Sequence, residues 1–352
     1  MENQTVVAPL RQPIEFELEG FDVPSGYGPF LFLLALLVYM LVLLGNGVVL
    51  CAIVMDQNLH RPMFIMICHL LICDLLGSTA MVPCLMMQLL LGQKKIVYLS
   101  AIAQAFCVHT YGMAMQTVLG VMAYDRWERI SQANLITAGF PLMFVFFMFS
   151  VWYVAVCEPL RYCSIMTSSR LHSCCALAWT VALLLIAVLF SFHVNVPLCG
   201  RVIRHVYCSN RGILDLFLQQ SSNRKFSCGF LCFKGLSITW SMSSGVFLVI
   251  AFSYFRILRA SLRQGRTDSS IRSKALQTCA SHLVVYVIYE MATTIIVVSY
   301  RFPSASQNIK KFFSILFIMF PPAINPIIYG LVSKELRSSI VKRFSTRVTD
   351  KT

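Results

Sequence analysis

Long apolar runs, separated by short polar segments, make up most of the chain from residue 28 onward. A helix needs about 20 predominantly apolar residues to cross the ~30 Å hydrocarbon core of a bilayer. Hydropathy predicts seven such helices, at residues 28–54, 63–91, 98–125, 171–196, 235–260, 275–300 and 311–332. The pattern therefore predicts an all-α membrane protein, a seven-transmembrane helix bundle that occupies residues 28–332.

One further apolar run, residues 141–157, is at the lower length limit for crossing. If this run crossed, every later segment would change sides of the membrane. Because cytoplasmic loops carry an excess of Lys and Arg, the positions of these residues can decide between seven and eight spans. Seven spans with an outside N-terminus place the larger share of Lys and Arg inside, whereas eight spans place it outside. The charge distribution modestly favours seven spans.

Polar segments flank this bundle at both ends. Residues 1–27 form an acidic tail in which Asn3 begins an Asn-Gln-Thr glycosylation acceptor, which is usable only if this end is extracellular. Residues 333–352 form a basic tail in which apolar residues recur at helical spacing: Leu336, Ile340, Val341 and Phe344. This spacing predicts a short amphipathic C-terminal helix on the inner leaflet, with a solvated tail as the alternative. We expect a multi-pass plasma-membrane protein with an extracellular N-terminus.

Composition and charge argue against several other classes of protein. Only 12% of the residues are charged, against about 25% in soluble domains, which argues against a soluble enzyme. The net charge of +14 comes from short basic clusters between apolar runs, as expected for contact with anionic lipid and not with nucleic acid. The His residues are scattered, so we expect no metal site, no cofactor and no enzymatic activity. A polytopic transporter is an alternative, although no internal repeats are evident in the sequence.

Three polar residues occupy comparable depths in three of the apolar spans. Asp74 lies in the middle of the second span, Asn46 in the first and Asn325 in the seventh. Because polar groups in hydrocarbon are costly, their default interpretation is functional. We expect a shared polar cluster around water or a cation. The alternative is that each residue forms a hydrogen bond with a neighbouring helix.

Two sequence features at the inner ends of the spans predict a conformational switch. Asp125 is followed directly by Arg126 at the end of the third span, and such a pair can hold its charge-assisted contact in one state and release it in another. In the seventh span, Pro326 removes a backbone donor and bends the helix, which places Tyr329 near the same inner face.

Several segments together carry a resemblance to a known family: GN at 45–46, LHRPMF at 59–64, MAYDR at 122–126, CEPLRY at 157–162, SY at 253–254, KALQTCASHL at 274–283 and NPIIYG at 325–330. They resemble the odorant (olfactory) receptor branch of the rhodopsin-like (class A) G-protein-coupled receptors, most closely the fish type. The resemblance extends over nearly all of residues 28–347. NPIIY marks the wider superfamily, whereas MAYDR, CEPLRY and KALQTCASHL are specific to the odorant branch.

The resemblance implies an odorant receptor. Such a receptor binds a small extracellular molecule within the bundle and activates a heterotrimeric G protein, here the stimulatory olfactory type, on the cytoplasmic face. It also implies roles for individual residues. Arg126 would pair with Asp125 at rest, and Tyr254 and Tyr329 would swing toward Arg126 on activation. The buried polar residues of the second and seventh spans would form the polar cluster between them.

Residues 127–152 depart from the family pattern. In odorant receptors MAYDR continues directly into YVAVCEPLRY, whereas here this insert separates Arg126 from Tyr153. The insert contains most of the apolar run 141–157, and its removal would restore an uninterrupted family motif. Retained intron sequence or a faulty gene model is one explanation, which would make the chain a non-signalling receptor-like product. A real extension of the second intracellular loop, where the G protein docks, is the other.

The cysteines depart from the family as well. Most of the 14 Cys are predicted to be small buried apolar residues, and only those in the polar loop at 199–232 look placed for oxidation. The family's outer disulfide joins the start of the third span to the following extracellular loop, but Ala101 is at the matching position. Cys107 is about 9 Å further down the helix, too deep for a simple replacement. Cys208 matches the loop partner and would then be free.

A second disulfide implied by the family in the same loop would join Cys199 to Cys228 or Cys232. The loop is longer here than in the family, and its pairing stays open. Another departure is Met115, at the position where odorant receptors usually carry an acid midway down the third span. Sodium coordination beside Asp74 is correspondingly less expected.

A ligand pocket is expected between the spans in their outer half. His109, Met113 and Gln116 share one face of the third span because they follow an i, i+4, i+7 spacing. Glu290 stands where the odorant branch generally has Tyr, and we expect it to contact a polar or cationic group of the ligand. The alternative is a structural partner for Glu290, such as His109 or a hydroxyl. Arg301, further outward, would attract an anion or lie at the headgroups.

Overall fold

The computed structural model describes residues 15–21, 23–24, 26–134, 168–191, 201–217, 240, 243–248, 250–251, 255, 283–296, 298 and 307–349. In chain order the elements are β1 (Glu15–Leu18), α1 (Gly28–Met55), the 3-10 turn η1 (Gln57–Leu59), α2 (Pro62–Leu91), β2 (Lys95–Val97), α3 (Tyr98–Asn134), α5 (Ser168–Ser191), β3 (Val202–Ile203), α6 (Asn210–Phe217), α9 (Gln307–Val332) and α10 (Lys334–Thr349). Residues 243–248 and 283–296 are also helical.

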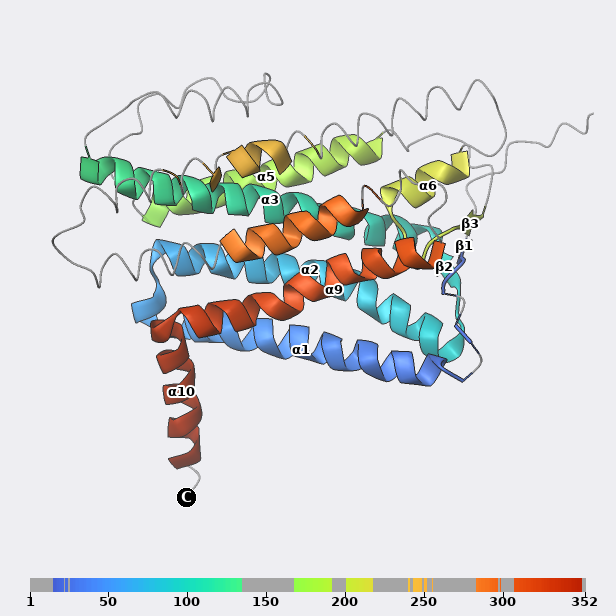
Figure 1. Ribbon diagram of the computed structural model, residues 1–352, viewed down its shortest axis with the longest axis horizontal. Coiled ribbons are helices and arrows are strands. Elements are labelled where there is room, and N and C mark those ends of the chain that lie inside the picture. The colour runs from blue at the N-terminus through green and yellow to red at the C-terminus, as the bar shows by residue number, and fades with distance from the viewer. Residues whose placement is uncertain are drawn as a thin grey trace, which may run out of the picture.

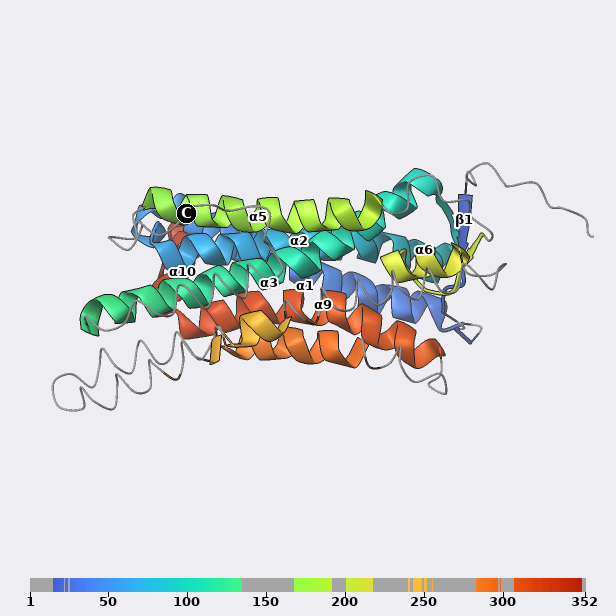
Figure 2. The same ribbon diagram turned by 90° about the horizontal axis from the view of Figure 1, so that it is seen from above.

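The long helices run side by side along the longest axis of the molecule and form a bundle (Figures 1 and 2). Helix α2 contacts α1 and α3, α3 contacts α5, and α9 lies against both α1 and α2. Among the described residues, α1, α2 and α9 are long and apolar enough to cross a membrane, and shorter apolar helices lie at Cys175–Ser191 and Leu283–Ile296. Helices α1 and α2 coincide with the first two predicted spans to within one residue.

Three helices have boundaries that differ from the predicted spans by three residues or more. Helix α5 begins at Ser168 and not at residue 171. Helix α3 continues to Asn134, beyond the predicted end at residue 125 and into the insert, because no Pro or Gly interrupts residues 125–134. Helix α9 begins at Gln307 and not at residue 311. The apolar run 141–157 lies outside the described residues.

Two glycines allow close approach between helices of the bundle, as small residues do in membrane proteins. A Cβ atom at Gly45 of α1 would lie 2.9 Å from Pro326 Cγ of α9. A Cβ atom at Gly77 of α2 would lie 2.6 Å from Cγ of Tyr111 on α3. Both positions therefore exclude larger side chains. Gly45 lets α9 approach α1, and Gly77 lets α3 approach α2.

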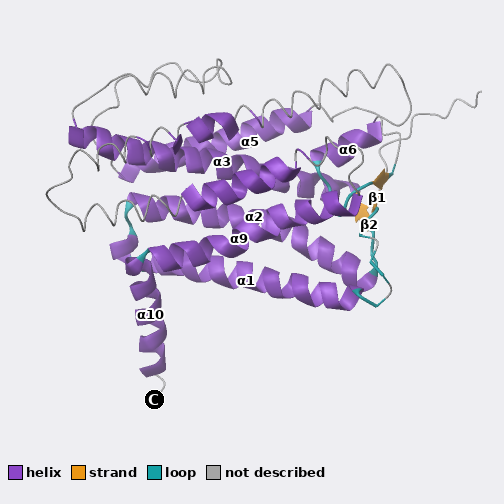
Figure 3. Cartoon of the chain, in the orientation of Figure 1, coloured by secondary structure: helices purple, strands orange, loops and turns teal. Residues whose placement is uncertain are grey.

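A three-stranded sheet at one end of the bundle was not anticipated from the sequence (Figure 3). Strand β1 is central, antiparallel to β2 and parallel to β3. The Glu-Phe-Glu-Leu sequence of β1 alternates polar and apolar residues, so Phe16 and Leu18 are buried on one face. They pack against Ala101 and Ala105 of α3. The N-terminal tail is thus attached to the bundle instead of extending freely from residue 15 onward.

Helix α10 lies at the opposite end and turns away from the bundle axis (Figure 1). Leu336 is fully buried and Ile340 packs against the core, whereas Val341, expected on the same apolar face, is 60% exposed. Two polar contacts attach α10 to the turn between α1 and α2. Ser339 Oγ donates to Asp56 Oδ2 over 2.6 Å, and Arg61 pairs with Glu335 over 3.0 Å. The Ser339 hydroxyl holds the pKa of Asp56 below its usual value.

Candidate functional site

A partly buried polar cluster joins α3 to two helical segments of the second half of the chain. Gln116 of α3 donates from Nε2 to Ser243 Oγ over 2.6 Å and to Glu290 Oε1 over 3.2 Å. The Tyr286 hydroxyl donates to the Ser243 carbonyl oxygen over 3.2 Å and lies beside the same carboxyl group. We call these four residues the Glu290 cluster. It gathers several hydrogen-bonding groups between helices, as a site for a polar ligand group requires.

The sequence identified only part of this cluster. Gln116 and Glu290 were both candidates, and the structure brings them together. Ser243 and Tyr286 were not identified. Tyr286 precedes Glu290 by one helical turn, so its spacing could have placed it on the same face, but no pattern in the sequence indicates which residue of another helix faces Gln116.

His109 and Met113 of α3 lie elsewhere on the predicted face. His109 Nε2 accepts a hydrogen bond of 3.1 Å from the backbone N–H of Asn210, at the start of α6, and its ring lies edge-on to Phe190 of α5. Met113 is buried in the main core cluster. The carboxyl group of Glu290 therefore has Gln116 and not His109 as its partner from α3, and His109 lies further outward, beneath the loop that leads into α6.

A second polar group lies at the end of the bundle that carries the sheet. Lys311 of α9 is 1% exposed, and its Nζ pairs with Glu19 Oε1 over 2.5 Å. His205 lies in the loop after β3 and is also buried, with its ring 4.5 Å from that of Tyr207. Burial and the nearby Lys311 charge lower the pKa of His205 to about 3, so this imidazole is neutral at pH 7. The segment after β1 is thereby joined to α9 through a buried ion pair.

The predicted polar cluster of the first, second and seventh spans consists of two separate contacts. Asn325 Nδ2 donates to Asp74 Oδ2 over 2.7 Å. Asn46 Nδ2 donates to the Pro322 carbonyl oxygen over 2.9 Å. That carbonyl lacks its usual helical donor because the residue four positions later is Pro326, which has no N–H. The second oxygen of Asp74 and the amide oxygen of Asn46 have no hydrogen-bond partner among the described residues.

The predicted switch residues are described only in part. Pro326 contacts the Gly45 position, and Tyr329 is 2% exposed within the main core. Asp125 and Arg126 belong to α3, but their side chains lie outside the described part of the chain. The other candidates outside it are Asn3, Cys199, Cys228, Cys232, Tyr254 and Arg301. Across the described ranges, no group of His, Cys, Asp and Glu is arranged to hold a metal ion.

Cys208 is buried beside Ala101 and Ala105, and its thiol is free in the structure. The pairing of the other loop cysteines stays a prediction because they lie outside the described residues.

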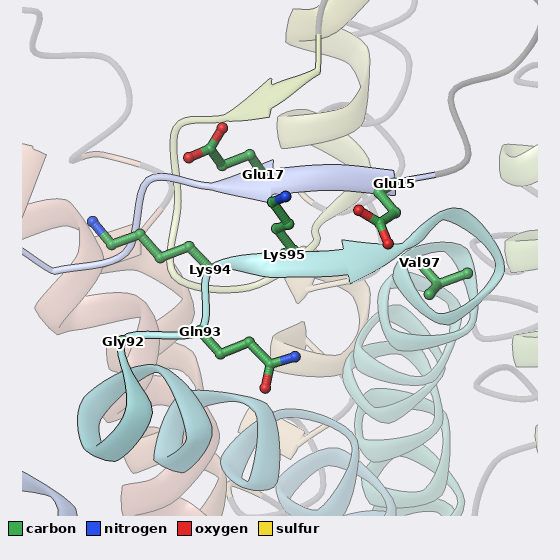
Figure 4. A pocket seen from close by; sticks show the side chains of 7 residues that line it. All are labelled: Glu15, Glu17, Gly92, Gln93, Lys94, Lys95 and Val97. Atoms are coloured by element: carbon green, nitrogen blue, oxygen red, sulfur yellow. The ribbon is translucent and has the colours of Figure 1, made fainter.

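A cavity of about 450 Å³ lies on the outer surface, between the edge of the sheet and the end of α2 (Figure 4). Its charged lining residues are Glu15, Glu17, Lys94 and Lys95. Glu17 and Lys95 are directly paired across β1 and β2, so charges of both signs line the cavity. It is not formed by the Glu290 cluster, and its mixed charge favours no particular class of ligand.

Comparisons with known proteins agree with the arrangement of these helices. The olfactory receptor family model matches residues 35–140 and 143–347, and the interruption falls inside the 127–152 insert. Human olfactory receptor 2K2 is 31% identical over 329 residues, which cover 93% of this chain and 92% of that receptor. Human olfactory receptor 10H1 is 29% identical over 341 residues, which cover 95% of this chain and 94% of that receptor. These relatives are mammalian, so the resemblance to fish receptors stays a prediction.

The fold is also that of a solved receptor. Squid rhodopsin superposes with a TM-score of 0.61 and 14% sequence identity, over 94% of this chain and 89% of that one. The fold is therefore a seven-transmembrane helix bundle, which fits the long apolar helices of the structure. The chain belongs to the olfactory receptor family of rhodopsin-like G-protein-coupled receptors, which are multi-pass membrane receptors and not enzymes.

Proposed function

We propose that the chain is an odorant receptor of the plasma membrane, with its N-terminus outside the cell. It binds a small molecule within the helix bundle and activates a heterotrimeric G protein of the stimulatory olfactory type on the cytoplasmic face. The observation that carries this proposal is the Glu290 cluster. It joins three helical segments at one point, so a ligand that changes its hydrogen bonds also changes how these segments pack.

The cluster favours an odorant with a polar or cationic group. Glu290 is only partly buried, and its carboxyl group interacts with Gln116, Ser243 and Tyr286. A carboxylate has about four lone-pair sites, so it can also accept a hydrogen bond from a ligand. A ligand ammonium or hydroxyl would satisfy this capacity and add a charge-assisted hydrogen bond. Met113 offers apolar contact on the same helix. We place His109 and Arg301 at the outer part of the site, where a ligand enters.

The activation switch that we propose connects this site to the inner face. At rest Arg126 pairs with Asp125, and on activation Tyr254 and Tyr329 move toward Arg126. The contacts of α9 support a helix that can change its position. Asn325 and the carbonyl of Pro322 attach α9 to the first two helices by side-chain hydrogen bonds, which are of modest strength between membrane helices, about 0.6–2 kcal/mol each.

The two ends of the molecule support the proposed orientation. The sheet and the acidic N-terminal segment would face outward, where Asn3 is available for glycosylation. Helix α10 would lie on the cytoplasmic face, with its Lys and Arg residues toward anionic lipid. An epitope tag at the N-terminus should therefore be stained on intact cells, and a C-terminal tag only after the cells are made permeable. Staining of both tags on the same side would contradict the orientation.

Replacing the Glu290 carboxylate tests the ligand site directly. In cells that express the receptor with the olfactory G protein, Glu290→Gln should raise the half-maximal concentration of polar or cationic agonists about 10- to 100-fold, since a hydrogen bond to a charged group contributes about 1.5–3 kcal/mol. Cyclic AMP is the readout. Glu17→Gln, which removes an exposed carboxylate at the outer sheet, is the matched control and should leave potency unchanged. Unchanged potency of every agonist on Glu290→Gln would remove Glu290 from the site.

A further inference from the structure

Cys84 lies on one face of α2, near the outer end of this helix. Glutamine side chains on either side of it hold the loop that follows β3. Ala80, Cys84 and Gln88 follow an i, i+4, i+8 spacing and therefore lie along the same side of the helix. The loop after β3, residues 206–208, lies across this side. The two contacts that hold it there come from glutamine side chains.

Gln88 makes the contact on the outward side of Cys84. Its Nε2 donates to the carbonyl oxygen of Val206 over 2.8 Å and lies 3.4 Å from Cys84 Sγ. The sulfur of Cys84 is therefore on the same side of α2 as the loop. Gln88 belongs to α2, so its contact connects the helix directly to a residue two positions before Cys208.

Gln104 of α3 makes the contact on the inward side. Its Nε2 donates to the Ala80 carbonyl oxygen over 3.0 Å, and its Oε1 accepts from the backbone N–H of Cys208 over 2.8 Å. One amide group thus links the backbone of α2, one turn before Cys84, to the backbone of Cys208. The hydrogen bonds of Gln88 and Gln104 together hold residues 206–208 of the loop on both sides of Cys84.

The two sulfur atoms share one environment. Cys208 is fully buried in the cluster that contains Phe16, Ala101 and Ala105, and Cys84 packs against the same cluster. Burial raises the pKa of the Cys208 thiol, and Cys84 contributes to the increase. The Cys208 thiol is unreactive as long as it stays buried and protonated. Cys107 of α3 is not among the described residues of this cluster.

We propose that Cys84 and Cys208 form a disulfide in the mature protein, which joins α2 to the loop ahead of α6. Each thiol loses its proton, and the two sulfurs give up two electrons to the disulfide of an oxidising protein in the secretory pathway, which is reduced to a dithiol. The reaction requires the outer end of the bundle to face the oxidising compartment, so it rests on the orientation proposed above. This bond gives Cys208 a partner on α2, because Ala101 stands on α3 where the family has the cysteine that pairs with this loop.

Peptide mapping of the full-length receptor tests the proposal without any variant. Receptor from mammalian cell membranes is alkylated, digested without reduction and analysed by mass spectrometry. The expected result is a linked peptide pair that contains Cys84 and Cys208 and that disappears on reduction. Recovery of both cysteines as alkylated thiols, or of Cys208 linked to Cys199, Cys228 or Cys232, would overturn the proposal. Surface staining of an N-terminal tag on the same cells reports the orientation separately, so the two failures can be told apart.

Thiol counts in cysteine variants provide a second measurement. In denatured, unreduced receptor, Cys84→Ser should expose one additional alkylatable thiol, since Cys208 loses its partner. The matched control Cys107→Ser should remove one. Ala101→Cys should compete for Cys208 and leave part of Cys84 alkylatable. Loss of one thiol in Cys84→Ser, as in the control, would contradict the proposed bond even if that variant is expressed poorly.

Discussion

The two ends of the bundle are held together by different kinds of contact. The end that carries the sheet is called the outer end and the end that carries α10 the inner end, after the orientation proposed above. At the outer end, a buried ion pair between Lys311 and Glu19 joins α9 to the segment after β1, and glutamine side chains join α2 and α3 to the neighbouring loop. At the inner end, the ion pair that attaches α10 is that of Arg61 and Glu335, in which both side chains are more than half exposed, beside the Ser339–Asp56 hydrogen bond and buried Leu336.

The difference follows from the cost of breaking each kind of contact. Removing one partner of a buried ion pair leaves an uncompensated charge, which costs about 3–5 kcal/mol. An exposed pair contributes about 0–1 kcal/mol because water and salt screen it. Breaking the ion pair at the outer end is therefore costly, whereas breaking the Arg61–Glu335 pair at the inner end costs little. With the orientation and the activation switch proposed above, the costly contact lies on the extracellular side and the exposed pair on the cytoplasmic side, where the switch is proposed to act.

The largest loss of stability is expected for Glu19→Gln, which leaves the buried Lys311 charge without its partner. Because Glu19 is itself about one-third exposed, we reduce the expected destabilisation to about 2–3 kcal/mol. Thermal denaturation of the purified receptor in detergent measures it. The double variant Glu19→Gln/Lys311→Met should recover most of the loss because no buried charge remains. Equal stability of Glu19→Gln and the exposed control Glu17→Gln would show that the ion pair does not hold the outer end.

Close packing between α1 and α9 gives the next effect. Gly45→Ala would place a Cβ atom 2.9 Å from Pro326 Cγ, and a proline ring cannot rotate away, so we expect a loss of about 1–3 kcal/mol. Gly47→Ala is the matched control on the same helix, since a Cβ atom there would meet nothing within 4 Å. The same denaturation assay applies. Because Ala has a higher helix propensity than Gly, Gly47→Ala should be neutral or slightly stabilising. An equal effect of the two variants would show that contact with α9 does not limit the Gly45 position.

The outer end should also be the pH-sensitive end. The pKa of His205 is lowered to about 3 by burial and by the nearby Lys311, whereas an unfolded His titrates near pH 6.5. The unfolded chain therefore binds the extra proton first, and stability is lost as the pH falls below about 6.5, by about 1–2 kcal/mol at pH 5. His205→Gln should flatten this part of the stability profile. His60→Gln, which removes an exposed His at the inner end, should leave the profile unchanged; an unaltered profile in His205→Gln would assign the pH dependence to other groups.

The two ends also differ in how well they could be predicted. The spans were evident from hydropathy, and Asp74 and Asn325 could be paired because polar residues in hydrocarbon must find a partner. The outer sheet was missed because β1 has only four residues and pairs with strands distant in the sequence. The pairing of Lys311 with Glu19 was missed because these two residues are also far apart in the sequence. Which acid of the N-terminal tail reaches α9 depends on a turn at Gly20, whose φ of +70° a sequence pattern does not reveal.

The smallest effect is expected at the inner end, for Glu335→Gln. This variant removes the exposed pair with Arg61 and a favourable charge in the first turn of α10, which together contribute about 0.5 kcal/mol or less at physiological salt. Leu336 and Ser339 stay in place and keep α10 attached. The measurement is the same thermal denaturation at low and high salt, with Arg337→Gln as an exposed control on the same helix. A loss as large as that of Glu19→Gln would mean that α10 is held as firmly as the outer segment, and the inner end could then not be the part of the receptor that rearranges at low cost.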